Sequence, residues 1–525
     1  MGALTLLLVL LIATVLLAPI ADRFSVPYPV ALLMFGLLLA FIPGVQVPSV
    51  DPELILPLVL PPLLFAAARR TSWREFLDNR RAIGLLAVAL VGVTAFAVGA
   101  LLHALVPGLP LVAGIAFGAA VAPPDPIAAT AVAHKLRLPH RLRTILEGEG
   151  LSNDATALVL YEVAVTATMT GAFSPWHAAG RLALALVVGV AVGLVIAILT
   201  RWLISRLPAH PAGSALILVV PFVAYAAADA AHGSGVISVV TVALALSRSG
   251  DVESSQTRLV AGTAWEIVEL LVAGAAFTFV GLELRAVASD VAGPLDVLVG
   301  QALLVTAVVM VIRFLWIFPV AALDERFRRR RSQVAEPVGW REMTVASWAG
   351  MRGVVTLVAA LALPVGPPAF PERDRLIFIA FVVIVATLLV QGLTLPLLVR
   401  ALGVCAPDGD RDDREQDILR RARDAGFRRL DEIGIRGDAD ADVIELAKEN
   451  ADRMWHSLGF QPPDGTTAEQ NADHARHADT VNAIKDELLA AAREQVVEAR
   501  TESGTDPTIA DRVLRRLDTR GSQPE

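Results

Sequence analysis

Cysteine is nearly absent from this sequence, since Cys405 is the only one among 525 residues. A single thiol excludes an intramolecular disulfide and leaves no cysteine cluster for a metal site. Charge is scarce as well: charged residues make up 18% of the chain and hydrophobic residues 55%. No basic residue precedes the first apolar run at residues 3–21, so this run is predicted to be a membrane span and not a cleaved signal peptide.

The apolar residues form long runs, and a run of roughly 20 is needed to cross a bilayer. We therefore predict an all-α polytopic membrane protein with about thirteen transmembrane helices. The predicted spans lie near residues 3–21, 27–44, 53–68, 82–106, 111–133, 150–171, 182–204, 213–231, 235–247, 263–283, 292–322, 343–364 and 376–400.

Charge divides the chain into two parts. Residues 404–525 hold 28 acidic and 18 basic residues, a net charge of -10, which leaves +3 for residues 1–403 out of the total of -7. Apolar runs stop at this boundary, and residues 443–460 and 480–500 have the pattern of amphipathic soluble helices. We predict a transmembrane domain over 1–403 and a helical cytoplasmic tail over 404–525, with a regulatory role as a hypothesis.

The basic residues predict the orientation, because Lys and Arg collect in short cytoplasmic loops. The basic loops are 69–81, 134–143 and 324–331, all at odd positions in the order of loops. This places the N-terminus outside the cell and the tail in the cytoplasm.

One predicted span carries three prolines around a carboxylate, in "AAVAPPDPIAAT" at residues 119–130. Pro123, Pro124 and Pro126 remove backbone donors, so the helix must be discontinuous there. A membrane tolerates such a break only where the backbone lines protein or water, and transporters bind ions at these sites. Asp125 is therefore a candidate ion ligand, although it could also cap the second half of the helix.

The next span begins with "EGEGLSNDATALVLY". Glu149 and Asn153 are four residues apart and share a helix face, while Asp154 turns toward a neighbouring groove. Burial disfavours the charged form of a carboxylate, so a proton and a cation can compete for it. Asp154 is our candidate for this group. The alternative is a carboxylate held by a structural hydrogen bond.

A later span, "SWAGMRGVVTLVAALALP", is interrupted by glycines and by Arg352. One weakened helix in each half of the membrane region is typical of an inverted repeat. Arg352 needs an anion, and Glu149 is the predicted partner. Charged residues inside a membrane are costly and indicate function. The remaining candidates of this kind are Glu162, Asp229, Glu266, Glu269 and Arg313.

Several long motifs closely resemble bacterial sodium/proton exchangers of the monovalent cation:proton antiporter superfamily, in the branch related to the animal exchangers. They include "LPPLLFAAARRTSWREF", "APPDPIAATAVAHKLRLPHRLRTILEGEGLSNDATALVLY", "FTFVGLEL", "RFLWIFP" and "WAGMRGVVTLVAALALP". The resemblance covers residues 1–403 and implies thirteen spans in two inverted repeats, a homodimer, and alternating access. It also implies that Asp125, Asn153 and Asp154 form the ion site and that Glu149 pairs with Arg352.

Three positions depart from the family pattern. Pro124 stands where relatives often have Thr, Gly150 where they have Ser, and Ala66 where many have Glu. Backbone carbonyls or water must then replace the missing side-chain oxygens, which leaves the preferred cation open. The family's Asn-Asp pair implies exchange of one proton for one cation, because Asn153 cannot titrate.

We therefore predict a Na⁺/H⁺ antiporter of the cell membrane that serves pH and cation homeostasis, with Li⁺ as a further substrate. A K⁺/H⁺ antiporter is the alternative within this class, and a cation channel or membrane sensor is the alternative from another class. No arrangement of nucleophile and base predicts an enzyme, and no cofactor or nucleic-acid partner is predicted.

Overall fold

The computed structural model divides into two compact units, Met1–Ala406 and Pro407–Glu525. The first unit is described from residue 3 to residue 404 apart from gaps at 25, 44–51, 71–78, 126–137, 172–174, 207–210, 248–254, 292, 331–338 and 367. Beyond residue 404, only residues 420, 423–428, 430–432, 435, 448 and 451 are described. The predicted tail helices therefore lie almost entirely outside the described residues, as does the expected second half of the helix that Asp125 interrupts.

The described part of the first unit consists of helices and connecting turns. Their bounds are α1 (Ala3–Arg23), α2 (Tyr28–Ala40), α3 (Pro52–Arg70), α5 (Arg80–Gly84), the π-helical turn η1 (Leu85–Leu90), α6 (Val91–Leu105), α7 (Leu111–Val121), α9 (His140–Thr170), α10 (Pro175–Arg206), α11 (Pro211–Ala230), α12 (Gly235–Ser247), α13 (Ser255–Leu282), α14 (Leu284–Asp290), α15 (Leu295–Arg330), α16 (Trp340–Trp348), α17 (Val354–Leu361) and α18 (Arg373–Leu402).

Most of the predicted spans coincide with these helices. Six described helical segments are long and apolar enough to cross a membrane, and five more are apolar but shorter, among them α2, α7 and α12. Apolar side chains also cover the outer surface of several helices. On α10, for example, Val195, Ile198 and Leu199 are exposed. Apolar side chains on the outside suit a lipid environment, and helices can cross it because their backbone polar groups are hydrogen-bonded internally.

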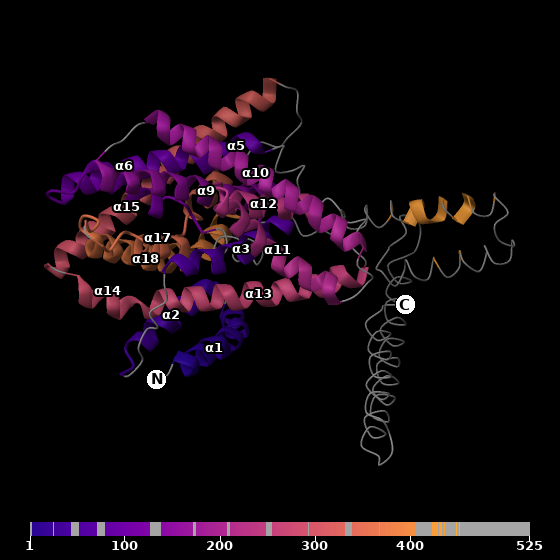
Figure 1. Cartoon of the computed structure of the whole chain (residues 1–525), viewed down its shortest axis with the longest axis horizontal. Coiled ribbons are helices and arrows are strands. Elements are labelled where there is room, and N and C mark those ends of the chain that lie inside the picture. The colour runs from indigo at the N-terminus through magenta and orange to yellow at the C-terminus, as the bar shows by residue number, and fades with distance from the viewer. Residues whose placement is uncertain are drawn as a thin grey trace, which may run out of the picture. The chain divides into compact units, whose positions relative to one another are not determined.

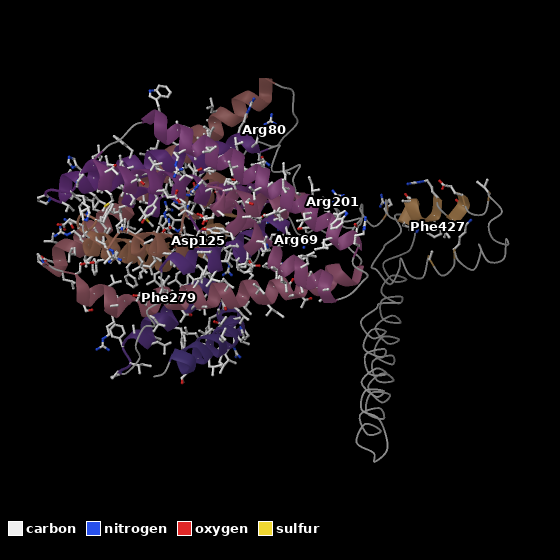
Figure 2. All side chains as sticks on the ribbon, in the orientation of Figure 1. Arg69, Arg80, Asp125, Arg201, Phe279 and Phe427 are labelled. Atoms are coloured by element: carbon white, nitrogen blue, oxygen red, sulfur yellow. The ribbon has the colours of Figure 1, made fainter. Side chains whose placement is uncertain are left out.

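Helices α17 and α18 lie between other helices of the first unit. In Figure 1, α17 and α18 lie between α13 on one side and α6 and α10 on the other. The short helix α17 packs against α3, α7 and α18. Figure 2 accordingly shows Asp125 near the middle of this unit, with Arg80 and Arg201 nearer its edge.

The π-helical turn η1 is held from outside by a neighbouring helix. The indole Nε1 of Trp316, on α15, donates a hydrogen bond of 3.2 Å to the carbonyl oxygen of Leu85. Such turns commonly mark functional regions of α-helices. Here the turn packs against α9, which carries Glu149, Asn153 and Asp154.

Candidate functional site

The first helix break follows α7, where Val121 is the last helical residue. Pro123 and Pro124 come directly afterwards and cannot donate backbone hydrogen bonds, so the chain leaves the helix at this point. The backbone N–H of Asp125 donates instead to the carbonyl oxygen of Met351, at 2.7 Å. The two interrupted segments therefore meet directly, and Asp125 lies where they cross.

The second break lies between α16 and α17, over residues 349–353. Its glycines permit close approaches that a side chain would prevent. A Cβ atom on residue 353 would overlap the Asp125 carboxylate, and one on residue 350 would press on the Arg313 side chain. The break that the sequence predicted from these glycines is present, and it lies against the break at Asp125.

Arg352 lies in the second break and is almost fully buried, with 2% of its surface exposed. Its Nε donates to the carbonyl oxygen of Val121 at 2.8 Å, and its Nη2 to that of Ala122 at 3.0 Å. Its Nη1 donates to the carbonyl oxygen of Gly350. The C-terminal ends of α7 and α16 both carry partial negative charge, and one guanidinium stabilises both.

Glu149 pairs with Arg313 and not with Arg352. The Arg313 guanidinium makes two parallel bonds to the Glu149 carboxylate, at 2.5 Å and 2.8 Å, and both side chains are buried. The predicted Glu149–Arg352 pair is therefore wrong. The physical reason is that the donors of Arg352 are already bonded to three carbonyl oxygens, whereas the packing of α15 directs the planar fork of Arg313 at the Glu149 carboxylate.

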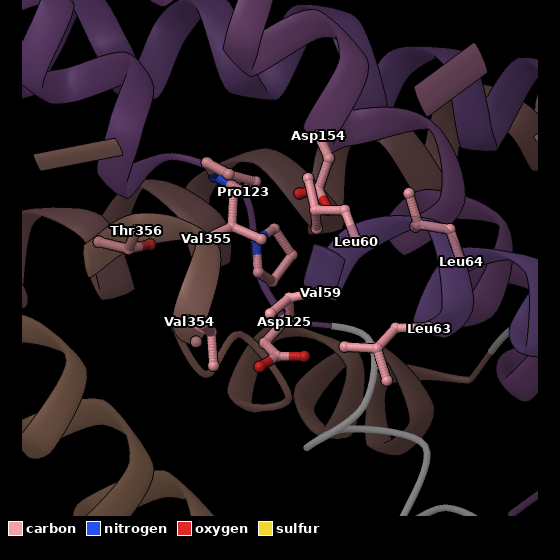
Figure 3. Close-up of a pocket in the computed structure, with 12 residues that line it drawn as sticks. Val59, Leu60, Leu63, Leu64, Pro123, Asp125, Asp154, Val354, Val355 and Thr356 are labelled. Carbon is pink, nitrogen blue, oxygen red and sulfur yellow. The ribbon is translucent and has the colours of Figure 1, made fainter. Parts of the chain in front are cut away.

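A small cavity lies beside the two breaks. Its volume is about 30 Å³, enough for roughly one or two water-sized occupants. Asp125 and Asp154 both line it, and Figure 3 shows their carboxylates at different edges of the lining. The remaining lining residues are Val59, Leu60, Leu63, Leu64, Pro123, Pro124, Gly353, Val354, Val355 and Thr356.

Asp154 is an isolated carboxylate in this cavity. Only 3% of its surface is exposed, and no described residue makes a hydrogen bond or ion pair with it. Neighbouring Asn153 is fully buried, and its Nδ2 donates to the carbonyl oxygen of Pro124 at 3.2 Å. Asn153 thus connects α9 to the broken helix, while the Asp154 carboxylate is left for an occupant of the cavity.

The lining has the chemistry of a site for a small cation. It supplies two carboxylates, and none of the described lining residues is Lys, Arg or His. A buried negative charge without a partner is unfavourable, so a cation or a proton bound there would stabilise it. The volume is too small for an organic substrate.

The other polar residues predicted to be functional lie elsewhere. Asp229, Glu162 and Glu266 are exposed, and Glu269 is half-buried; none of them lines the cavity. Gly150 is buried but is not part of the lining. Sequence reasoning missed Thr356, which does line the cavity, because one threonine in an apolar run gives little signal.

Thr387 is a further residue that the sequence did not indicate. It lies on α18, and its hydroxyl accepts a hydrogen bond of 3.1 Å from the backbone N–H of Arg352. The Thr387 hydroxyl itself donates a hydrogen bond of 2.8 Å to the carbonyl oxygen of Val383. Thr387 therefore fixes the second break from the side of α18.

Comparison with known proteins places the chain in a family. Residues 10–401 match the family described as sodium/hydrogen exchanger, transmembrane. An uncharacterized Na⁺/H⁺ exchanger of Mycobacterium tuberculosis is 34% identical over 525 residues, covering 97% of this chain and 93% of the relative. The Na⁺/H⁺ antiporter of Aphanothece halophytica is 31% identical over 404 residues, covering 76% of this chain and 74% of the relative.

Two further similarities bear on substrate and fold. The sodium, potassium, lithium and rubidium/H⁺ antiporter of Bacillus subtilis is 31% identical over 411 residues, covering 75% of this chain and 61% of the relative. The solved structure of a sodium proton antiporter from Methanocaldococcus jannaschii aligns with a TM-score of 0.59 at 17% identity, covering 76% of this chain and 98% of the other. The match over residues 10–401, together with the first of the relatives, shows that this chain is a multi-pass membrane transporter of the sodium/hydrogen exchanger family.

Proposed function

We propose that this protein exchanges a monovalent cation for a proton across the plasma membrane, with Na⁺ as the main cation. The observation that carries this proposal is the cavity where the two helix breaks meet. Two carboxylates line a volume of about 30 Å³ there, and none of the described lining side chains is positively charged. The family membership supports the reaction class. The charge and size of the cavity support a dehydrated or partly hydrated monovalent ion as its occupant.

Asp154 is the proposed carrier of the exchanged ions. Its carboxylate is desolvated, so the ionised form is disfavoured unless a positive charge binds to it. A proton and a Na⁺ ion each satisfy this need, and they exclude one another at the same oxygens. Asp125 shares the cavity and contributes a second set of carboxylate oxygens to the bound cation.

Exchange at one titrating carboxylate is expected to be electroneutral. One proton leaves Asp154 for each monovalent cation that binds, so each half-cycle moves the same charge. Asn153 takes no part in proton transfer because an amide does not titrate, and its hydrogen bond to Pro124 gives it a positioning role. The two concentration gradients then determine the direction of transport.

Potassium is the second candidate cation. The Bacillus subtilis relative is described as an antiporter of sodium, potassium, lithium and rubidium, so related sequences accept large as well as small ions. The departures at Pro124, Gly150 and Ala66 remove oxygens that relatives use or place nearby. A site with fewer fixed ligands discriminates less between cations.

We also propose the arrangement of the spans, the orientation in the membrane and the oligomeric state. The two broken helices, one at Asp125 and one at Arg352, support two inverted repeats within thirteen spans. The basic loops support an external N-terminus and a cytoplasmic tail. The resemblance supports a homodimer, and it supports alternating access by movement of one group of helices against another.

The direct test uses purified protein in liposomes that contain a pH-sensitive dye and an outward proton gradient. Addition of Na⁺ or Li⁺ outside is expected to dissipate the gradient, and K⁺ to do so more weakly. Empty liposomes are the control. No response to any of the three cations would refute the exchange reaction, whereas cation flux that needs no proton movement would indicate a channel.

A further inference from the structure

The lining of the cavity includes one neutral side chain with an oxygen atom, that of Thr356. This residue belongs to the first turn of α17 and is 1% exposed. All other lining residues are apolar residues, glycine, or the two aspartates. In Figure 3, Thr356 lies on the opposite side of the lining from Leu63 and Leu64. Among the described residues of the lining, Thr356 is therefore the one that offers a hydroxyl group to an occupant.

The carbonyl oxygens near the breaks are already engaged. Those of Val121, Ala122 and Gly350 accept hydrogen bonds from Arg352. That of Pro124 accepts from Asn153. The sequence led us to expect carbonyl oxygens as ligands in place of the missing Thr and Ser side chains. These four carbonyl oxygens instead accept hydrogen bonds from Arg352 and Asn153. A side-chain oxygen in the lining would therefore add to what these backbone groups offer a cation.

The hydroxyl of Thr356 is free to serve this purpose. Two buried threonines of the described helices, Thr278 and Thr306, donate to the carbonyl oxygen four residues earlier, both at 2.8 Å. Thr356 makes no such bond, and no hydrogen bond joins its side chain to any described residue. A buried hydroxyl without a partner is unfavourable, so an occupant that binds to it would be stabilised.

We propose that the Thr356 hydroxyl oxygen is a direct ligand of the transported cation and favours Na⁺ and Li⁺ over K⁺. This inference rests on the proposed exchange at Asp154. The hydroxyl replaces one water oxygen of the hydrated ion, and the number and strength of such dipoles determine selectivity between cations. Thr356, contributed by the second broken helix, thereby takes the place of the side-chain oxygens that Pro124 and Gly150 lack.

The test compares Thr356→Val with Thr356→Ser in the liposome assay. Valine has the shape of threonine without the hydroxyl, and because Thr356 has no internal hydrogen bond to lose, the variant should fold. We expect the valine variant to raise the apparent KM for Na⁺ about tenfold, the scale of one lost bond to a charged group, with little change in maximal rate. The serine variant should stay within about twofold of the wild type, since it keeps the ligand.

Thr306→Val is the matched control, because it removes a buried hydroxyl from α15, which does not contribute to the cavity. It should leave the apparent KM unchanged. Thermal stabilisation of each variant by added Na⁺ provides a readout that does not need transport. A valine variant with wild-type KM, or one that Na⁺ stabilises as much as the wild type, would overturn the role of Thr356. Failure of the wild type itself to exchange would overturn the proposed function, and this inference with it.

Discussion

Replacement of Asp154 by asparagine is expected to abolish cation-dependent proton movement. The change keeps the size and shape of the side chain. It removes the one buried carboxylate of the described lining that makes no hydrogen bond or ion pair with a described residue. Asp125 remains in the cavity but already has a partner, so no carboxylate is left to exchange a proton for a cation. The liposome dye assay should show a response no greater than that of empty liposomes, at every pH between about 6 and 9, a range that spans the physiological one.

The folded state should survive this substitution. Burial of a neutral amide avoids the cost of burying an unpartnered charge, so thermal stability should be equal or higher. Glu162→Gln is a matched control, because Glu162 lies on the same helix but is exposed and does not line the cavity. Exchange at the wild-type rate in Asp154→Asn would show that the ions bind elsewhere.

Replacement of Arg313 by alanine is expected to destabilise the protein strongly. Glu149 would then keep a buried charge without its bidentate partner, and breaking such a pair typically costs about 3 to 5 kcal/mol. Arg313 also donates from Nε to the carbonyl oxygen of Ala346 at 3.2 Å, so the contact between α15 and α16 would weaken too. Thermal unfolding in detergent, followed by tryptophan fluorescence, measures this effect.

A double replacement distinguishes loss of the Glu149–Arg313 ion pair from other effects of removing the Arg313 side chain. Glu149→Gln combined with Arg313→Gln removes both charges and should recover part of the lost stability. Arg285→Ala, at an exposed position on α14, should leave stability nearly unchanged. If the double variant recovers nothing, or if Arg313→Ala unfolds like the wild type, the ion pair does not stabilise the fold as we infer.

The end of α7 before Asp125 and the break at Arg352 could be predicted from sequence because their causes are local. Prolines beside Asp125 remove hydrogen-bond donors, and glycines around Arg352 weaken a helix whatever surrounds them. The position of Asp154 at a cavity followed from burial of a carboxylate within an apolar run. These features depend on residues close together in the chain.

The ion-pair partner of Glu149 could not be predicted from sequence, because it depends on how helices that are distant in the chain pack together. Arg313 and Arg352 are both buried arginines in apolar segments, and they differ only in which neighbours the fold brings to them. Arg313 lies 164 residues after Glu149 on α15, whereas Arg352 faces the end of α7. Hydropathy likewise indicated Glu162, Asp229 and Glu266 as intramembrane groups, but it could not show that these side chains are exposed.

Coupling of one proton to one cation at a single carboxylate is the central claim, and the response of exchange to voltage tests it most directly. In liposomes containing the protein, valinomycin and a K⁺ gradient impose a potential of either sign. The account predicts that, in a given K⁺ gradient of either direction, Na⁺/H⁺ exchange proceeds at the same rate with valinomycin and without it. Exchange driven by an inside-negative potential when no Na⁺ gradient is present would show that more than one proton moves per cation and that the single-carboxylate mechanism is wrong.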